Sequence, residues 1–342
     1  MVKADAYGHG AVVCARALEP DVWGLAVSLV EEGVELRRGG IAAPVVVLGG
    51  VYGRAHQDVV AFNLTPVVSE ADDLERFARA AAELAAPPVS VHLKVDTGMS
   101  RLGASPSALP ALFERARQIP GVVVRGLMTH LAEADGEDEA PTRAQLAVFA
   151  AARAELARLG LGPVLLHVSN TAGAARFADA RFDLVRPGIA LFGGVPAPRI
   201  AIPGLEPVLR LSSRIVALRD VPVGAGVSYG AAFRATRPTR IATIPIGYAD
   251  GYSRRLSAEG QVLVAGRRCR IAGNVTMDMT MVDVTDVPAE RGDEVVLIGA
   301  QRGPAGEDRI ALEELAAWSG TISWEICCGI SKRVPRVYSD RA

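Results

Sequence analysis

The sequence predicts an α/β barrel domain followed by a mostly antiparallel β-domain. Over residues 1–195, short apolar runs alternate with amphipathic stretches, a pattern typical of parallel strands joined by helices. Residues 193–205 are rich in Gly and Pro and predict a linker. Over residues 206–342, β-type runs then follow one another closely between turn signals. A chain of 342 residues is long enough to bury the cores of two domains.

Seven strands of the first domain are predicted from their apolar runs. They are expected at residues 22–27, 44–48, 65–68, 89–95, 123–129, 164–168 and 184–191. Helices are expected between them, at residues 11–18, 30–38, 70–84, 109–118 and 142–159. An eighth strand would lead into Lys3, and only Met1 and Val2 represent it. The eight units together predict a (β/α)8 TIM-type barrel whose first strand is truncated.

The second domain has a different sequence pattern, with shorter and more closely spaced apolar runs. Strands are expected at residues 213–219, 240–245, 261–264, 268–271, 279–284 and 294–298, and a short helix at residues 312–318.

Composition excludes several classes of protein. The 37 Lys and Arg residues nearly balance the 38 Asp and Glu residues without forming a basic stripe, which argues against nucleic-acid binding. No apolar run reaches membrane-spanning length. The four cysteines, among them the adjacent Cys327 and Cys328, lack metal-type spacing. We therefore expect a reduced, cytoplasmic protein without a metal site.

Basic side chains cluster at the ends of the predicted barrel strands. They are Lys3, Lys94, Arg101, His130, His167 and Arg186. The strand ends of a barrel converge on one mouth, where active sites are built. A single His or Arg in such a place is more often structural, but several at equivalent ends indicate one site.

Lys3 lies in the segment VKADAYGHG, between an apolar strand end and a turn of small residues with one tyrosine. Burial would lower the pKa of its amine, and the free amine could then form an imine with a carbonyl cofactor. A solvated N-terminal lysine is the alternative.

Two segments of the first domain fit a phosphate group. Gly188 lets a ligand approach the backbone closely, and its N–H and that of Ile189 are candidate donors. The hydroxyl of Thr171, at the start of a helical stretch, is a third. In the second domain, Tyr229 and Tyr248 stand between glycines that would present them in loops. Ordinary turns and surface tyrosines remain the alternatives.

Taken together, these segments resemble alanine racemase, the pyridoxal-phosphate enzyme of bacterial cell-wall metabolism. The match runs in order from residue 2 to the 331–338 segment. Its most specific pieces are VKADAYGHG, HLKVDTGMSRLG, VRPGIALFG, GVSYG, IGYADG and VTMDMTMVD. The resemblance implies interconversion of L- and D-alanine with pyridoxal 5′-phosphate, which would supply D-alanine for peptidoglycan. It also implies a cytoplasmic homodimer with shared active sites.

The resemblance further implies two catalytic bases. Lys3 would hold the cofactor as an imine and handle the Cα proton of the D-isomer, and Tyr229 of the other subunit would handle that of the L-isomer. Arg186 would face the pyridine nitrogen, oriented by His130 and His167. An arginine only donates hydrogen bonds, so the ring nitrogen would stay unprotonated.

The remaining implied roles concern the phosphate and the substrate. Tyr7, Thr171, Gly188 and Ile189 would hold the phosphate. Arg101 would lie near the substrate carboxylate, oriented by a carbamylated Lys94. Tyr248, Met277 and Asp278 would line the entrance.

Two departures from the family pattern matter. The β-strand, helix and most of the barrel strand that precede the lysine in the family are missing, so we expect either a start codon assigned too late or an inactive, truncated chain. Lys332 stands where some relatives place a phosphate-binding tyrosine. The alternatives are a racemase with a wider range, acting on serine or basic amino acids, and a cofactor-binding protein without racemase activity.

Overall fold

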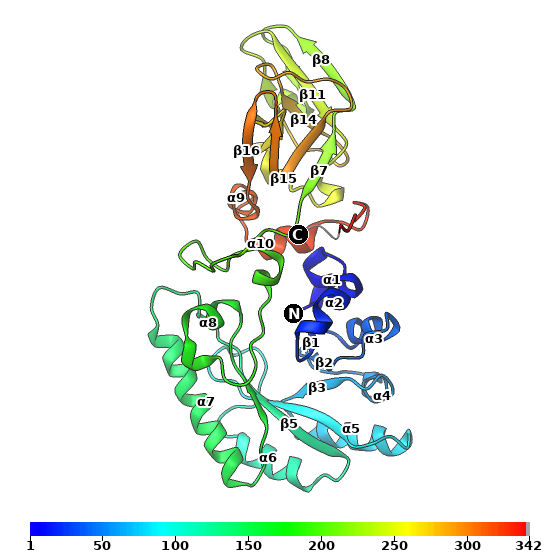
Figure 1. Ribbon diagram of the computed structural model, residues 1–342, viewed down its shortest axis with the longest axis vertical. Helices are drawn as coiled ribbons and strands as arrows, with labels where there is room; N and C mark the ends of the chain where they lie inside the picture. Colours follow the sequence, from blue (N-terminus) through cyan, green and yellow to red (C-terminus); the bar gives the residue numbers. More distant parts are fainter. Residues whose placement is uncertain (340–342) are drawn as a thin grey trace. The chain divides into compact units, whose positions relative to one another are not determined.

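The computed structural model describes residues 1–339 of the chain and divides it into two compact units (Figure 1). The first unit comprises Met1–Leu191 with Pro196–Pro203, and the second comprises Phe192–Val195 with the chain from Gly204 onward. The boundaries therefore lie within or directly before the Gly- and Pro-rich stretch of residues 193–205.

A six-stranded parallel sheet forms the centre of the first unit, and its strands are neighbours in chain order. The strands are β1 (Leu25–Val27), β2 (Val45–Val47), β3 (Thr65–Val68), β4 (Val89–Lys94), β5 (Val122–Met128) and β6 (Leu165–His167). The helices that connect and follow them are α2 (Ala11–Leu18), α3 (Val30–Arg38), α4 (Ala55–Ala61), α5 (Ala71–Glu83), α6 (Leu109–Gln118), α7 (Ala140–Arg158) and α8 (Thr171–Arg176). This half-barrel of parallel strands confirms the predicted α/β class.

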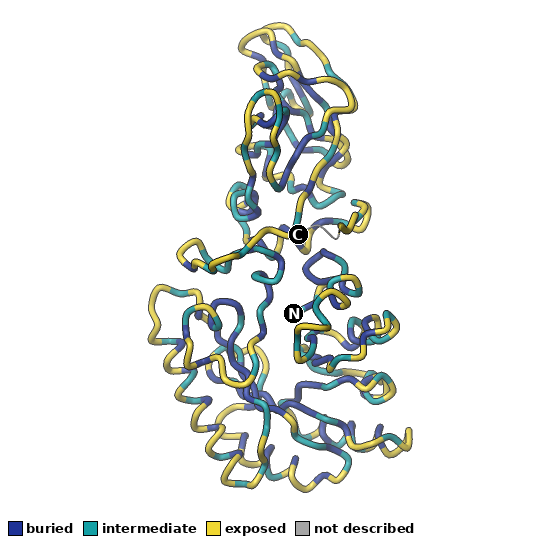
Figure 2. Tube along the Cα trace, in the orientation of Figure 1, coloured by how far each residue is buried: buried dark blue, intermediate teal, exposed yellow. Residues whose placement is uncertain are grey.

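The helices of this unit pack an apolar face on the sheet, as α5 shows. Leu74, Phe77 and Ala81 recur at helical spacing and are buried. Asp72 and Asp73 occupy the first turn, where their negative charges interact favourably with the helix dipole. Figure 2 shows burial concentrated along the strands, while exposed residues follow the outer sides of the helices and the loops.

The strand predicted at residues 184–191 is wrong. Leu184 forms only an isolated bridge with His167, and Ile189–Phe192 is a 3-10 turn. Pro187 has no N–H to donate to a strand ladder, which explains why pairing does not continue. The carbonyl of Pro187 instead accepts a hydrogen bond from the Met1 nitrogen (3.1 Å), and the N–H of Val2 donates to the carbonyl of Ala26 (2.9 Å). Met1 and Val2 thus connect β1 to the 184–187 segment.

The second unit is built from antiparallel pairs. In one sheet β11 (Thr239–Ile244) lies between β8 (Ala217–Val221) and β14 (Thr280–Asp283). In the other, β12 (Gln261–Val264) pairs with β13 (Arg267–Arg270) and with β15 (Glu294–Gly303), which also pairs with β7 (Leu211–Arg214) and β16 (Gly306–Ile310). The short strands β9 (Gly226–Val227) and β10 (Phe233–Arg234) form a separate pair, and α9 (Leu312–Trp318) and α10 (Ser323–Gly329) follow the sheets.

The run predicted as one strand at residues 213–219 is two strands in different sheets. The N–H of Ile215 donates to Asp293 next to β15, whereas that of Val216 donates to Thr243 of β11. The chain changes sheets between these two residues, and an apolar run alone does not signal such a change. Strand β16 and helix α10 were not predicted. For β16 the reason is its sequence, GEDRI, which is mostly polar.

Among residues 1–339, no helix is long and apolar enough to cross a membrane.

Candidate functional site

Lys3 begins a short turn, Lys3–Gly8 (α1), whose backbone is left-handed. Four consecutive residues, Ala4, Asp5, Ala6 and Tyr7, have φ between 52° and 55°. This conformation costs an L-residue roughly 1–2 kcal/mol. The turn therefore depends on tertiary contacts that hold it in place.

Glu32 on α3 supplies the main contact. One carboxylate oxygen accepts the N–H of Ala4 (2.6 Å), and the other accepts those of Ser28 (2.7 Å) and Leu29 (3.0 Å). Asp5 in turn accepts the N–H of Ala11 at the start of α2 (2.7 Å). The backbone next to Lys3 is thus fixed to the loop after β1 and to α2.

Arg186 is 8 % exposed and is held by four acceptors. Its Nη1 donates to Nδ1 of His167 (2.9 Å). Its Nη2 donates to the carbonyls of Thr129 (2.7 Å) and Val168 (2.8 Å) and, at 3.3 Å, to Nδ1 of His130. Burial lowers the pKa of Arg186 to about 10, so the guanidinium is still a cation at neutral pH. Its Nε is buried and has no hydrogen-bond partner among residues 1–339. Such an orphaned donor is costly unless a ligand meets it.

The histidines around Arg186 are neutral. Burial, followed by the charge of Arg186, lowers the pKa of His130 to about 3 and that of His92 to about 4. The same causes lower the pKa of His167 well below its usual value. A guanidinium only donates, so its histidine partners must accept with an unprotonated nitrogen.

Lys94 is buried at the end of β4, and its pKa is lowered to about 8. Burial is the largest cause, followed by the charges of Arg101 and Arg186, with a smaller contribution from Lys3. These cations therefore lie within electrostatic reach of one another. Such a concentration of positive charge suits anionic groups.

Three of the predicted phosphate residues come together. The N–H of Gly188 donates to Oγ1 of Thr171 (2.9 Å). A Cβ at position 188 would lie 2.6 Å from the hydroxyl oxygen of Tyr7, so a larger residue there would require the Tyr7 side chain to move. Ile189 begins the 3-10 turn directly after Gly188.

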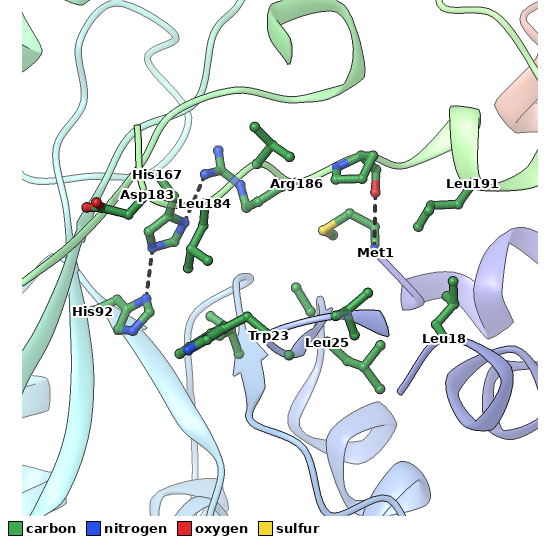
Figure 3. Close-up of a pocket in the computed structure, with 16 residues that line it drawn as sticks. Met1, Leu18, Trp23, Leu25, His92, His167, Asp183, Leu184, Arg186 and Leu191 are labelled. Carbon is green, nitrogen blue, oxygen red and sulfur yellow. Dashed lines mark hydrogen bonds between the residues drawn. The ribbon is translucent and has the colours of Figure 1, made fainter. Parts of the chain in front are cut away.

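A cavity of about 310 Å³ adjoins the Arg186 network (Figure 3). Its lining includes His92, His167, Arg186, Trp23 and Leu184. Figure 3 shows the two histidines and Arg186 joined in a row by hydrogen bonds.

The second unit brings its own predicted residues together. The N–H of Tyr248 donates to the carbonyl of Thr276, and the N–H of Ala249 donates to that of Met277, both at 3.0 Å. Arg333 forms ion pairs with Asp278 (2.8 Å) and Asp250 (3.3 Å), one in each of these loops.

Tyr229 is 77 % exposed, and its carbonyl accepts a hydrogen bond from the side chain of Asn274 (3.0 Å). Its loop is therefore tied to the segment that leads to Met277. Lys332 is exposed.

Comparison with known proteins places the chain in a family. Residues 1–196 match the model of the alanine racemase N-terminal domain, and residues 208–338 match that of the C-terminal domain. The chain belongs to the alanine racemase family. Enzymes of this family are isomerases that use pyridoxal phosphate.

Relatives match over nearly the whole chain. An alanine racemase of Sorangium cellulosum is 48 % identical, over 99 % of this chain and 91 % of its own length. An alanine racemase of Symbiobacterium thermophilum is 45 % identical, over 99 % of this chain and 89 % of its own length. The structure of alanine racemase from Streptomyces coelicolor superposes with a TM-score of 0.92 at 36 % identity, covering 99 % of this chain and 91 % of that one.

Sequence reasoning missed two residues of the site. Glu32 carries no motif, because its role depends on a tertiary contact with the Lys3 turn. His92 could have been predicted from the sequence, because it lies two positions before Lys94 on a strand and alternate residues of a strand share a face.

We expect Glu32→Gln to loosen the Lys3 turn. The amide would turn an NH2 group toward at least one backbone N–H that now meets an oxygen, so two donors would face each other. The free energy of unfolding should fall by about 1–3 kcal/mol. Amide hydrogen exchange at Ala4, Ser28 or Leu29 should also become faster.

Glu31→Gln is the matched control, since Glu31 is the exposed neighbour on the same helix. Equal unfolding free energies and equal exchange rates in the two variants would contradict this role of Glu32.

Proposed function

We propose that this chain interconverts L- and D-alanine with pyridoxal 5′-phosphate, using Lys3 and Tyr229 of a second copy as its two bases. The observation that carries the proposal is the buried Nε–H of Arg186, which has no hydrogen-bond partner in the described part of the chain. A donor-only guanidinium suits an unprotonated pyridine nitrogen as acceptor. This choice favours brief removal and return of a proton over reactions that need a long-lived carbanion.

The residues of the first unit fit this cofactor. Lys3 would provide the amine that binds its carbonyl carbon. Tyr7, Thr171, Gly188 and the N–H of Ile189 would surround the phosphate. Arg101 would add positive charge on the side where a substrate carboxylate would lie, and the carbamate of Lys94 would orient it.

When bound, pyridoxal phosphate takes up the electron pair left on the substrate Cα after its proton is removed. The Lys3 amine would remove or return the proton on the D-face. The Tyr229 phenol would do so on the L-face. Two groups are needed, because a single base that returns its proton to the same face preserves the configuration.

His130 would prepare Tyr229 for this role. Its Nδ1 accepts from Arg186, so the proton of the neutral ring lies on Nε2. An Nε2–H that donates to the phenolic oxygen would stabilise the phenolate as a base.

The exposure of Tyr229 supports a homodimer. Its phenol stands on a loop anchored by Asn274, yet the residue is largely exposed. A second copy would cover it and receive it as a base.

The second unit also supports alanine as the substrate. Tyr248 and Met277 are large side chains that would narrow the entrance to one suited to a small amino acid. The carboxylate of Asp278 is already paired with Arg333, so it is not a free partner for a basic side chain. This pairing argues against basic amino acids.

The first test measures the visible absorbance of the chain with pyridoxal phosphate and the loss of optical rotation of L-alanine. Only three of the 37 Lys and Arg residues are lysines, namely Lys3, Lys94 and Lys332. We expect Lys3→Ala to abolish both the lysine-bound cofactor band and racemisation, and Lys332→Ala to retain both. A chain that shows neither signal before substitution would refute the proposal.

We expect Tyr229→Phe to separate the two bases. Racemisation should fall by about 10²–10⁴-fold, the usual contribution of a general base. In heavy water, D-alanine should still exchange its Cα proton through Lys3, whereas L-alanine should not. Equal exchange of both isomers in this variant would contradict the assignment of Tyr229.

We expect Lys94 to form a carbamate whose amount depends on pH. The pKa of Lys94 is about 8, below the usual 10.5. Its amine therefore becomes neutral at a pH about two to three units lower than the amine of an exposed lysine. At fixed ¹³C-bicarbonate, the carbamate signal should rise about tenfold per pH unit below pH 8 and level off above it. Lys94→Met should remove the signal and Lys332→Met should keep it. A signal that persists without Lys94 would rule this site out.

A further inference from the structure

His92 is the far end of a row of three side chains that begins at Arg186 (Figure 3). Nη1 of Arg186 donates to Nδ1 of His167 (2.9 Å), and Nε2 of His167 lies 2.8 Å from Nδ1 of His92. All three side chains are buried, and His92 is 1 % exposed. In the proposed reaction neither histidine of this row touches the substrate.

The direction of the hydrogen bonds in this row follows from Arg186. Because the guanidinium only donates, Nδ1 of His167 carries no proton. His167 is neutral, so its single proton lies on Nε2 and is donated to Nδ1 of His92. His92 is neutral as well, which places its own proton on Nε2. Each ring is thereby restricted to one tautomer.

The neighbouring strand is shaped around the His92 ring. Gly126 on β5 is the register partner of His92, and a Cβ there would lie 2.5 Å from the ring. A glycine inside a strand weakens the strand and often marks a close approach. The ladder register also shifts between Val91 and His92. On another side, the ring of Trp23 lies 6.2 Å from that of His92. The ring orientation is therefore set by packing on two elements.

The row matters for Arg186 because the opposite tautomer of His167 would turn an N–H toward the guanidinium. Two donors would then face each other across 2.9 Å in a buried site. Arg186 would lose its Nη1 contact, and only the contacts of Nη2 would still orient its plane. The direction of the Nε–H depends on that plane.

We propose that His92 is a positioning residue that accepts the Nε2 proton of His167, holds that ring in the tautomer Arg186 requires, and so fixes the direction of the Arg186 Nε–H. The tautomers of His167 and His92 follow from the hydrogen bonds of the row and do not depend on the proposed function. Their consequence for catalysis rests on the proposed function, in which the Nε–H of Arg186 meets the pyridine nitrogen.

The experiment reads histidine tautomers by ¹⁵N NMR, in the full chain with and without pyridoxal phosphate. The chain has five histidines, so single substitutions assign every ring. We expect His167 and His92 to carry their protons on Nε2 and to stay neutral from pH 6 to 8. A His167 ring that is protonated on Nδ1, or on both nitrogens, would overturn the proposal before any variant is made.

Two variants then test the acceptor. His92→Asn places an oxygen near the position of Nδ1, whereas His92→Leu fills similar space without any acceptor. We expect the Leu variant to lose the single-tautomer signal of His167 and roughly tenfold in kcat, with KM for alanine little changed. The Asn variant should restore the His167 tautomer and most of kcat. His56 is paired with Asp73 on α4 and α5, and its signals in the same spectra serve as the control for the fold.

The outcomes separate the two proposals. If His92→Leu keeps both the His167 signal and kcat, His92 has no positioning role. If His92→Asn and His92→Leu lose the His167 tautomer signal and kcat to the same extent while the His56 signals are unchanged, the hydrogen-bond acceptor at position 92 does not hold the His167 ring. That result would contradict the proposal. If the tautomers and their dependence on His92 are as expected but the protein does not racemise alanine, the row stands and the proposed function fails.

Discussion

The rest of this site depends on one buried cation, the guanidinium of Arg186. A buried positive charge is costly, and two main-chain carbonyls and two neutral histidines offset that cost. Burial, followed by the charge of Arg186, lowers the pKa values of the histidines, and burial with the charges of Arg101 and Arg186 lowers that of Lys94. Burial and charge together thus leave hydrogen-bond acceptors around Arg186 and a partly neutral amine nearby.

The predictability of the fold followed the strength of local patterns. Helices α2, α3, α6 and α9 begin and end where the sequence indicated, because helical periodicity and their flanking residues act locally. The errors occurred where tertiary context decides. Pro187 ends strand pairing in an otherwise apolar run, and Ile215 changes sheets within one run. Strand β16 is stabilised by pairing with β15 and not by its own composition.

The site was predictable as a set of residues and less so as a geometry. Strand ends pointed to Lys94, His130 and His167, since parallel strands place their carboxyl ends together, whereas Arg186 was assigned to a strand that does not form. The left-handed turn after Lys3 had no such signal, because alanine, aspartate and tyrosine do not favour it and Glu32 holds it from another element. In the proposed reaction, the strained backbone next to Lys3 would fix the start of a side chain that has to reach one face of the substrate.

The scarcity of lysine has a practical consequence for chemical labelling. Of the three lysine amines, Lys94 is buried with a low pKa, Lys3 opens the strained turn, and Lys332 is exposed. Aldehydes and activated esters, which modify dozens of surface amines on an ordinary protein, would therefore act here almost as site-directed reagents. Amine cross-linkers such as glutaraldehyde would find few anchor points. A faint cross-linked band would then reflect the shortage of amines rather than the oligomeric state.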